Sequence, residues 1–135
     1  MGKKALKTLK MKFKYFTYNE FDCKGGIGKG ESMDDNFICM LDDAREEAGI
    51  PFKIVSGFRT PEYNKQLIDY GFKASTTSSH LIGLAVDIEA KTSLERFKIV
   101  TALLKVGINR IGLGEEFIHA DYDQNKTSKL IWNYY

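Results

Sequence analysis

The chain has 135 residues, of which 43% are apolar and 28% are charged. This length and composition fit one globular domain with a single hydrophobic core, and they exclude a disordered or low-complexity protein. Twenty basic residues against eighteen acidic ones leave a net charge of +2, which is too balanced to indicate a nucleic-acid partner.

The chain starts with a lysine-rich segment, residues 1–12, which we expect to be a flexible arm ahead of one domain over residues 13–135. Lysines interrupt the apolar run of ~7–15 residues that a signal peptide needs. No stretch approaches the ~18 apolar residues of a membrane span. We therefore expect a protein that is synthesised in the cytoplasm, without a visible signal peptide or a membrane span.

Residues 13–31 combine aromatic side chains, which we expect to lie over the core, with a cluster of glycines. The Gly28-Lys29 pair in this cluster invites comparison with a phosphate-binding P-loop. That motif requires a glycine where this chain has Cys23, and a serine or threonine where it has Gly30. We therefore interpret the cluster as a mobile loop.

Two helices are predicted in the first half of the chain. Ser32 is expected to cap the first, which runs to Ala48 and ends at Gly49. The second follows Thr60 with a proline in its first turn and ends near Gly71. Apolar residues at helical spacing predict the buried stripe of the first helix: Met33, Phe37, Leu41, Ala44 and Ala48.

A third helix is predicted over residues 93–106, where Thr92 and Glu95 form a capping box and Gly107 ends the helix. The same spacing argument predicts its buried face: Leu94, Phe97, Val100 and Leu104.

Strands are predicted between and after these helices, at 52–56, 84–90, 109–113, 117–122 and, less distinctly, 129–134. Residues 73–79 indicate a polar loop. The final strands are too close together for helical crossovers, so we expect antiparallel pairing there. The sequence thus predicts an α+β domain with a small, mainly antiparallel sheet and about three helices packed on it.

Only two histidines occur in the chain, and both stand close to acidic residues. Alternate side chains of a strand share a face, so two neighbouring strands can point Asp87 and His119 at one spot. His80 can reach the same spot from the preceding loop. Two imidazoles and one carboxylate are a common catalytic zinc set with an open fourth position.

Iron oxygenases also use two histidines and one carboxylate, commonly with a His-x-Asp pair such as His119-Ala120-Asp121. Spacing alone does not separate zinc from iron. The chain is nevertheless short for a jelly-roll barrel and lacks its repeated strands.

A family resemblance favours zinc. Ser78, His80, Gly83, Ala85 and Asp87 match the Ser-x-His-x-x-Gly-x-Ala-x-Asp motif of the zinc D-alanyl-D-alanine carboxypeptidase family, the M15 peptidases. The segments 55–64 and 117–121 resemble that family's Ser-Gly-Tyr-Arg and His-x-Asp segments, and residues 16–21 resemble the start of its small phage and bacterial members. The resemblance covers roughly residues 13–123 and implies a Hedgehog/DD-peptidase-like fold.

The resemblance also implies roles for individual residues. His80, Asp87 and His119 would bind Zn²⁺, and Arg59 would stabilise the oxyanion and contact substrate. Ser78 is expected to contact substrate or to orient His80.

The general base is less clearly indicated. Glu116 is the favoured candidate, because several family members have an acidic residue three positions before the last histidine. Asp121 is the alternative base, and it would otherwise hold a ligand or an arginine in place.

The resemblance implies a zinc peptidase that hydrolyses peptidoglycan stem peptides, either at D-Ala-D-Ala or at L-Ala-D-Glu. We expect a monomer with peptidoglycan peptides as its partners, acting on the cell wall after phage-type release, as an endolysin does. A catalytically silent zinc-bearing binding module of the same fold is the alternative, although the presence of both Glu116 and Arg59 argues against it.

Overall fold

The computed structural model describes residues 12–134. The predicted arm at 1–12 therefore lies outside the described residues except for Lys12, which forms an ion pair with Asp35 at 2.5 Å. Within the described residues, no helix is long and apolar enough to cross a membrane.

The three predicted helices are present as α2 (Asp35–Ala48), α3 (Pro61–Asp69) and α4 (Ser93–Lys105). Thr60 caps α3, and Thr92 and Glu95 form the predicted capping box of α4. The cap of α2 is Asp34, whose side chain accepts from the Phe37 amide at 2.9 Å. Ser32, the predicted cap, instead ends a short 3-10 helix, because the chain makes one more turn before α2 begins.

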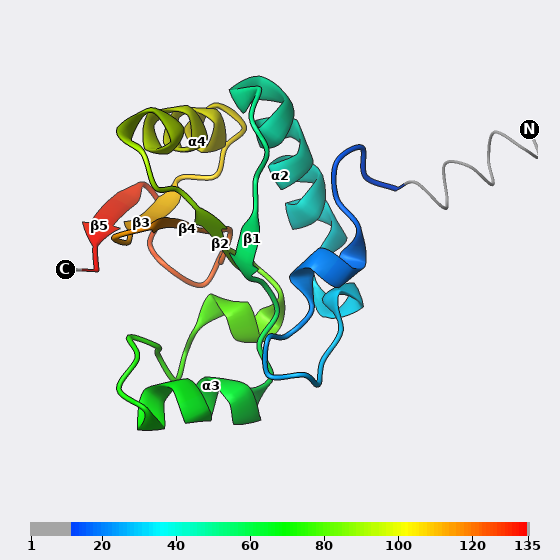
Figure 1. The fold of residues 1–135 in the computed structure, drawn as a ribbon, viewed down its shortest axis with the longest axis vertical. Coiled ribbons are helices and arrows are strands. Elements are labelled where there is room, and N and C mark those ends of the chain that lie inside the picture. The colour runs from blue at the N-terminus through cyan, green and yellow to red at the C-terminus, as the bar shows by residue number, and fades with distance from the viewer. Residues whose placement is uncertain (1–11, 135) are drawn as a thin grey trace, which may run out of the picture.

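The strands β1 (Ile54–Ser56), β2 (Ala85–Glu89), β3 (Arg110–Leu113), β4 (Phe117–Asp121) and β5 (Leu130–Asn133) form one sheet in the order β1-β2-β4-β3-β5. Neighbouring pairs are antiparallel except β3 and β5, which are parallel. The expected antiparallel pairing is therefore wrong for the last strand. The loop 122–129 carries the chain past β3 to its outer edge, where β5 runs in the direction of β3 (Figure 1).

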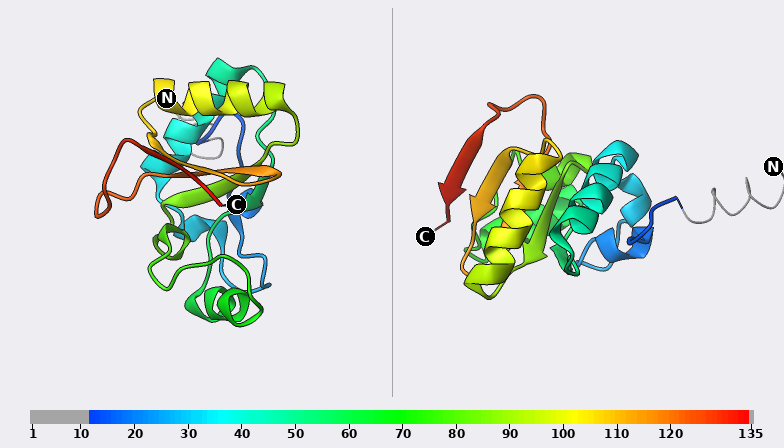
Figure 2. Two further views of the ribbon diagram at one scale, coloured as in Figure 1. Left: turned by 90° about the vertical axis from the view of Figure 1, so that its left-hand side faces the viewer. Right: turned by 90° about the horizontal axis from the view of Figure 1, so that it is seen from above.

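Helices α2 and α4 lie side by side over one face of the sheet and enclose the core (Figure 2). The predicted stripe of α2 is buried from Met33 to Ala44. The predicted buried face of α4 is wrong, because Leu94 and Phe97 are 62% and 67% exposed. Helix α4 carries two apolar stripes at helical spacing, and the one that faces α2 and β4 is Ile99, Ala102 and Leu103.

Helix α3, the 3-10 helix η3 (Ser79–Ile82) and the glycine cluster lie on the opposite side of the sheet from α2 and α4 (Figure 1). Over residues 12–134, this arrangement confirms the α+β class, with a five-stranded, mostly antiparallel sheet and three α-helices. It also leaves the polar side chains of the second sheet face toward α3.

Candidate metal centre

One row of residues crosses all five strands on the face that points toward α3. The pairing register places Ser56 opposite Asp87, Asp87 opposite His119, His119 opposite Gly112, and Gly112 opposite Trp132. Directly opposed residues in a sheet project to the same side. The register therefore brings Asp87 and His119 together, as strand alternation predicts.

His80 reaches this row from η3, which occupies part of the predicted polar loop. The Ser78 hydroxyl accepts from the His80 amide at 3.2 Å, so Ser78 caps the short helix. Gly83 ends it with a φ of 71°. A Cβ at Gly83 would lie 2.8 Å from the Met33 Cα, which leaves room there only for glycine.

The ring of His80 is held so that one nitrogen faces the site. Its Nδ1 lies 2.7 Å from the Gly57 carbonyl oxygen, which can only accept, so Nδ1 carries the proton. The Nε2 lone pair then faces Asp87 Oδ1 at 3.5 Å. Burial lowers the pKa of His80, which keeps the imidazole neutral and able to bind a metal.

His119 is also hydrogen-bonded through both ring nitrogens, but with Nδ1 rather than Nε2 facing Asp87. Its Nε2 lies 2.8 Å from Asp121 Oδ2, and its Nδ1 lies 3.0 Å from Asp87 Oδ1. Burial alone would lower the pKa of His119, but the hydrogen bonds to Asp121 and Asp87 outweigh it and raise the pKa. When Nε2–H donates to Asp121, Nδ1 is the nitrogen left to bind a metal beside Asp87.

Both carboxylates of this pair stay ionised. Burial would raise the pKa of Asp87, but the neighbouring His80 and His119 outweigh burial and lower it. The pKa of Asp121 is also lowered, because its hydrogen bond to His119 and its contact with Arg110 outweigh desolvation. Two ionised carboxylates flanking His119 favour a bound cation.

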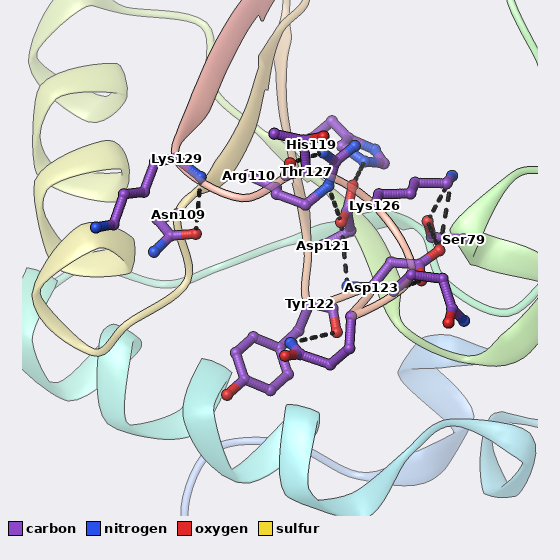
Figure 3. A network of polar contacts seen from close by, with 12 residues as sticks. Ser79, Asn109, Arg110, His119, Asp121, Tyr122, Asp123, Lys126, Thr127 and Lys129 are labelled. Atoms are coloured by element: carbon purple, nitrogen blue, oxygen red, sulfur yellow. Dashed lines mark hydrogen bonds and ion pairs between the residues drawn. The ribbon is translucent and has the colours of Figure 1, made fainter.

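Asp121 lies behind His119 within a polar network (Figure 3). Arg110 Nε donates to its Oδ1 at 2.7 Å, and the Asp123 amide donates to the same oxygen at 3.3 Å. Both oxygens of this buried carboxylate are thus occupied by N–H donors. Asp121 is thus hydrogen-bonded to the ring of His119 on the side away from Asp87. The five-stranded sheet is not the jelly roll expected of an iron oxygenase.

The donor set fits zinc. His80, Asp87 and His119 each offer one ligand atom, and these atoms all lie within 4.8 Å of one another. Two ligands ~2.0–2.1 Å from a tetrahedral zinc lie ~3.3 Å apart, and the separations to Asp87 Oδ1 are 3.0 and 3.5 Å. Both imidazoles have their other nitrogen hydrogen-bonded, as metal-binding histidines usually do.

Arg59 lies beside this cluster, with its side chain only 11% exposed. Its Nη2 is 3.5 Å from Asp87 Oδ2, and its Nε donates to the Ser56 hydroxyl at 3.3 Å. Its Nη1 donates to the Asn64 side chain at 3.3 Å, and Asn64 in turn donates to the Ser75 carbonyl at 2.8 Å. Asn64 is thus a site residue to which the sequence analysis gave no role. The available signal was its position in the first turn of the predicted helix, five residues after Arg59.

Two adjoining cavities open at the cluster. The smaller, of about 200 Å³, is lined by the three candidate ligands and by Ser78. The larger, of about 560 Å³, is lined by Arg59, Asp87 and apolar side chains of α3 and β1. Glu116 and Glu115 both line the larger cavity and both are exposed.

Sequence reasoning gave no role to three residues that complete the site wall. Arg110 pairs with Asp121, and its guanidinium lies 5.1 Å from the Trp132 ring centroid. Trp132 and Tyr134 line the smaller cavity. The predicted strand at 129–134 was the available signal, since alternation gives Trp132 and Tyr134 a common face.

Comparison with known proteins supplies a relationship over most of the chain. A family model described as Peptidase M15 matches residues 14–121. No curated protein matches the chain. Among solved structures, the crystal structure of the L-Ala D-Glu endopeptidase ChiX from Serratia marcescens matches with a TM-score of 0.54 at 17% sequence identity, covering 70% of this chain and 84% of that one. At this identity the structural match shows a shared fold.

Proposed function

The chain belongs to the M15 peptidase family, and from this premise we propose that it is a zinc-dependent peptidase that hydrolyses peptidoglycan stem peptides. The observation that carries the proposal is the cluster of His80, Asp87 and His119, whose ligand atoms converge at the meeting point of two cavities. The cleaved bond is either D-Ala-D-Ala or L-Ala-D-Glu, and the products of digestion distinguish them.

In this proposal, His80 Nε2, Asp87 and His119 Nδ1 hold the zinc ion. Bound zinc supplies a Lewis acid that polarises the substrate carbonyl and makes water acidic enough to attack near neutral pH. The chain contributes the rigidity of the site. Gly57 fixes the ring of His80, and Asp121 fixes the ring of His119.

Arg59 is proposed to bind the carbonyl oxygen as negative charge develops on it. Ser56 and Asn64 hold the guanidinium in place before substrate arrives, so little reorganisation is needed during the reaction. Its partial pairing with Asp87 at 3.5 Å leaves donor capacity for a substrate oxygen.

Glu116 is proposed as the general base that takes a proton from the attacking water. Its carboxylate lines the larger cavity beside Arg59 and Asp87. The hydrogen bonds of Asp121 support this choice, because this carboxylate accepts from His119 with one oxygen and from Arg110 with the other and so already serves to hold these two side chains. Ser78 is proposed to act by capping the helix that carries His80.

The test is digestion of purified peptidoglycan peptides followed by mass spectrometry, with zinc-loaded protein, chelator-treated protein and zinc-restored protein. Cleavage that chelator abolishes and zinc restores is expected. Zinc-loaded protein that cleaves no stem peptide would overturn the proposal and favour a silent zinc-bearing module.

A matched pair of variants tests the base. Glu116→Gln should keep zinc and lose ~10²–10⁴ in kcat, whereas Glu115→Gln on the same cavity wall should stay near the parent. The reverse result would assign the base to Glu115.

A further inference from the structure

An aromatic cluster from the last strand covers His119. The ring centroids of Trp132 and Tyr134 lie 5.6 and 6.2 Å from that of His119, and Tyr134 also contacts Phe117 at 5.4 Å. Strand β5 and Tyr134 lie beyond residues 14–121, the part matched by the family model. The family relationship therefore assigns no role to this cluster.

The ring of Tyr134 is fixed against the sheet. The Tyr134 amide donates to the Leu113 carbonyl at 3.0 Å, which continues the pairing of β5 with β3. Its carbonyl accepts from the Lys73 ammonium. The ring lies over Gly112, where a Cβ would come within 2.5 Å of Tyr134 Cε2. Glycine at position 112 thus lets the ring approach His119, its neighbour in the row that crosses the strands.

Tyr134 lines both cavities, as do Arg59 and Asp87. Asp121 lines the smaller of these cavities with it. Burial raises the pKa of Tyr134 to about 12. The neighbouring Trp132 indole, whose ring centroid lies 6.3 Å from that of Tyr134, can only donate, so it does not compete for the phenolic proton.

We propose that Tyr134 is a further catalytic residue, which donates its phenolic O–H to the carbonyl oxygen of the scissile peptide bond, alongside Arg59. This inference rests on the proposed peptidase function. Two fixed donors at one oxygen stabilise the charge that develops there better than one, because neither has to reorganise during the reaction. The hydroxyl forms a hydrogen bond that strengthens as the carbonyl oxygen becomes negative, and no proton is transferred from it.

The experiment compares zinc-loaded parent protein with Tyr134→Phe, which keeps the ring and removes only the hydroxyl. The expected result is a kcat lower by ~10²–10³, the loss typical of one oxyanion donor, with KM and zinc content unchanged. Tyr70→Phe is the matched control, because this exposed tyrosine lines none of the cavities described here, and it should behave as the parent.

A second readout does not depend on turnover. A phosphinate analogue of the cleaved peptide carries a fixed negative oxygen, and calorimetry should show its Kd weakened in Tyr134→Phe by a factor similar to the loss in kcat. An unchanged kcat and an unchanged phosphinate Kd would overturn the inference while leaving the peptidase function intact. A change in KM alone, or loss of zinc from Tyr134→Phe, would also overturn it. A parent protein that neither cleaves stem peptides nor binds the phosphinate would instead refute the proposed function.

Discussion

Replacing Asp121 with asparagine tests whether this carboxylate orients His119 or acts as the base. The buried Asp121 accepts from His119 Nε2 at 2.8 Å through one oxygen and from Arg110 Nε at 2.7 Å through the other. An amide has only one oxygen, so its NH₂ group must face one of these N–H donors. With the present proton positions, either orientation sets two N–H donors against each other, and the neutral amide in either case binds its partners more weakly than the carboxylate does.

The size of the expected effect on zinc binding depends on whether Arg110 or His119 keeps the amide oxygen of the new asparagine. The charged guanidinium of Arg110 binds an oxygen more strongly than a neutral imidazole N–H does, so the NH₂ group should turn toward His119. Nε2 of His119 then accepts, and the proton moves to Nδ1, the nitrogen that faces Asp87. We expect zinc affinity to fall ~10–100-fold, as for other residues that support a ligand, and the free energy of unfolding to fall by about 1–3 kcal/mol.

The assay is competition for zinc with a chromophoric chelator, together with kcat at saturating zinc. Asp121→Asn should recover most of the parent kcat once zinc is bound. Asp123→Asn is the control, because Asp123 is a buried carboxylate whose hydrogen-bond partners are the Ser79 hydroxyl at 2.7 Å and the Asn125 amide at 3.0 Å. A variant Asp121→Asn that binds zinc like the parent but has no activity would refute the reasoning and make Asp121 the base.

Three further predictions concern the fold, protonation and Arg59. Gly83→Ala should lower the free energy of unfolding, measured in urea, by about 3 kcal/mol or more, because a left-handed φ of 71° combines with a backbone clash. The control Gly49→Ala, at a φ of 70° with open space around it, should lower it by only about 1–2 kcal/mol. Equal losses in the two variants would contradict the backbone clash at Gly83. The raised pKa of His119 stabilises the zinc-free chain below pH ~6.5 and this stability is lost as pH rises through the raised value. Zinc must displace that proton, so calorimetry in buffers of different ionisation enthalpy should show proton release and an affinity that rises with pH. Zinc binding without proton release would contradict the raised pKa of His119. Asn64→Ala should keep zinc but lower kcat by up to ~10²-fold, since the Arg59 guanidinium loses one of the bonds that hold it in place. An unchanged kcat would mean that Ser56 alone is enough to position Arg59.

Local signals predicted the elements well because they depend on neighbouring residues. Thr92 with Glu95 fixes the start of α4, and strand alternation brings Asp87 and His119 to one face. The predicted cap of α2 is wrong by two residues, since Ser32 and Asp34 are both competent caps and tertiary packing of the preceding 3-10 turn decides between them.

The remaining differences have a common cause in long-range packing. The stripe containing Leu94 and Phe97 has the same helical spacing as the one that is buried, and only the position of α2 selects between them. The direction of β5 depends on how the loop 122–129 crosses the end of β3. For the same reason the position of Tyr134 over His119 could not be read from spacing.

Because β5 lies at the edge of the sheet, the surface that faces a substrate could be altered independently of the spacing between the candidate metal ligands. Register between β2 and β4 sets the distance from Asp87 to His119, and β5 takes no part in that pairing because it is hydrogen-bonded to β3 alone. Exchanging Trp132, which lines the smaller cavity, while keeping Tyr134 would therefore change the surface offered to a substrate and leave the spacing of the candidate ligands intact. The edge strand is thus the natural place to graft a different substrate preference onto an unchanged metal centre.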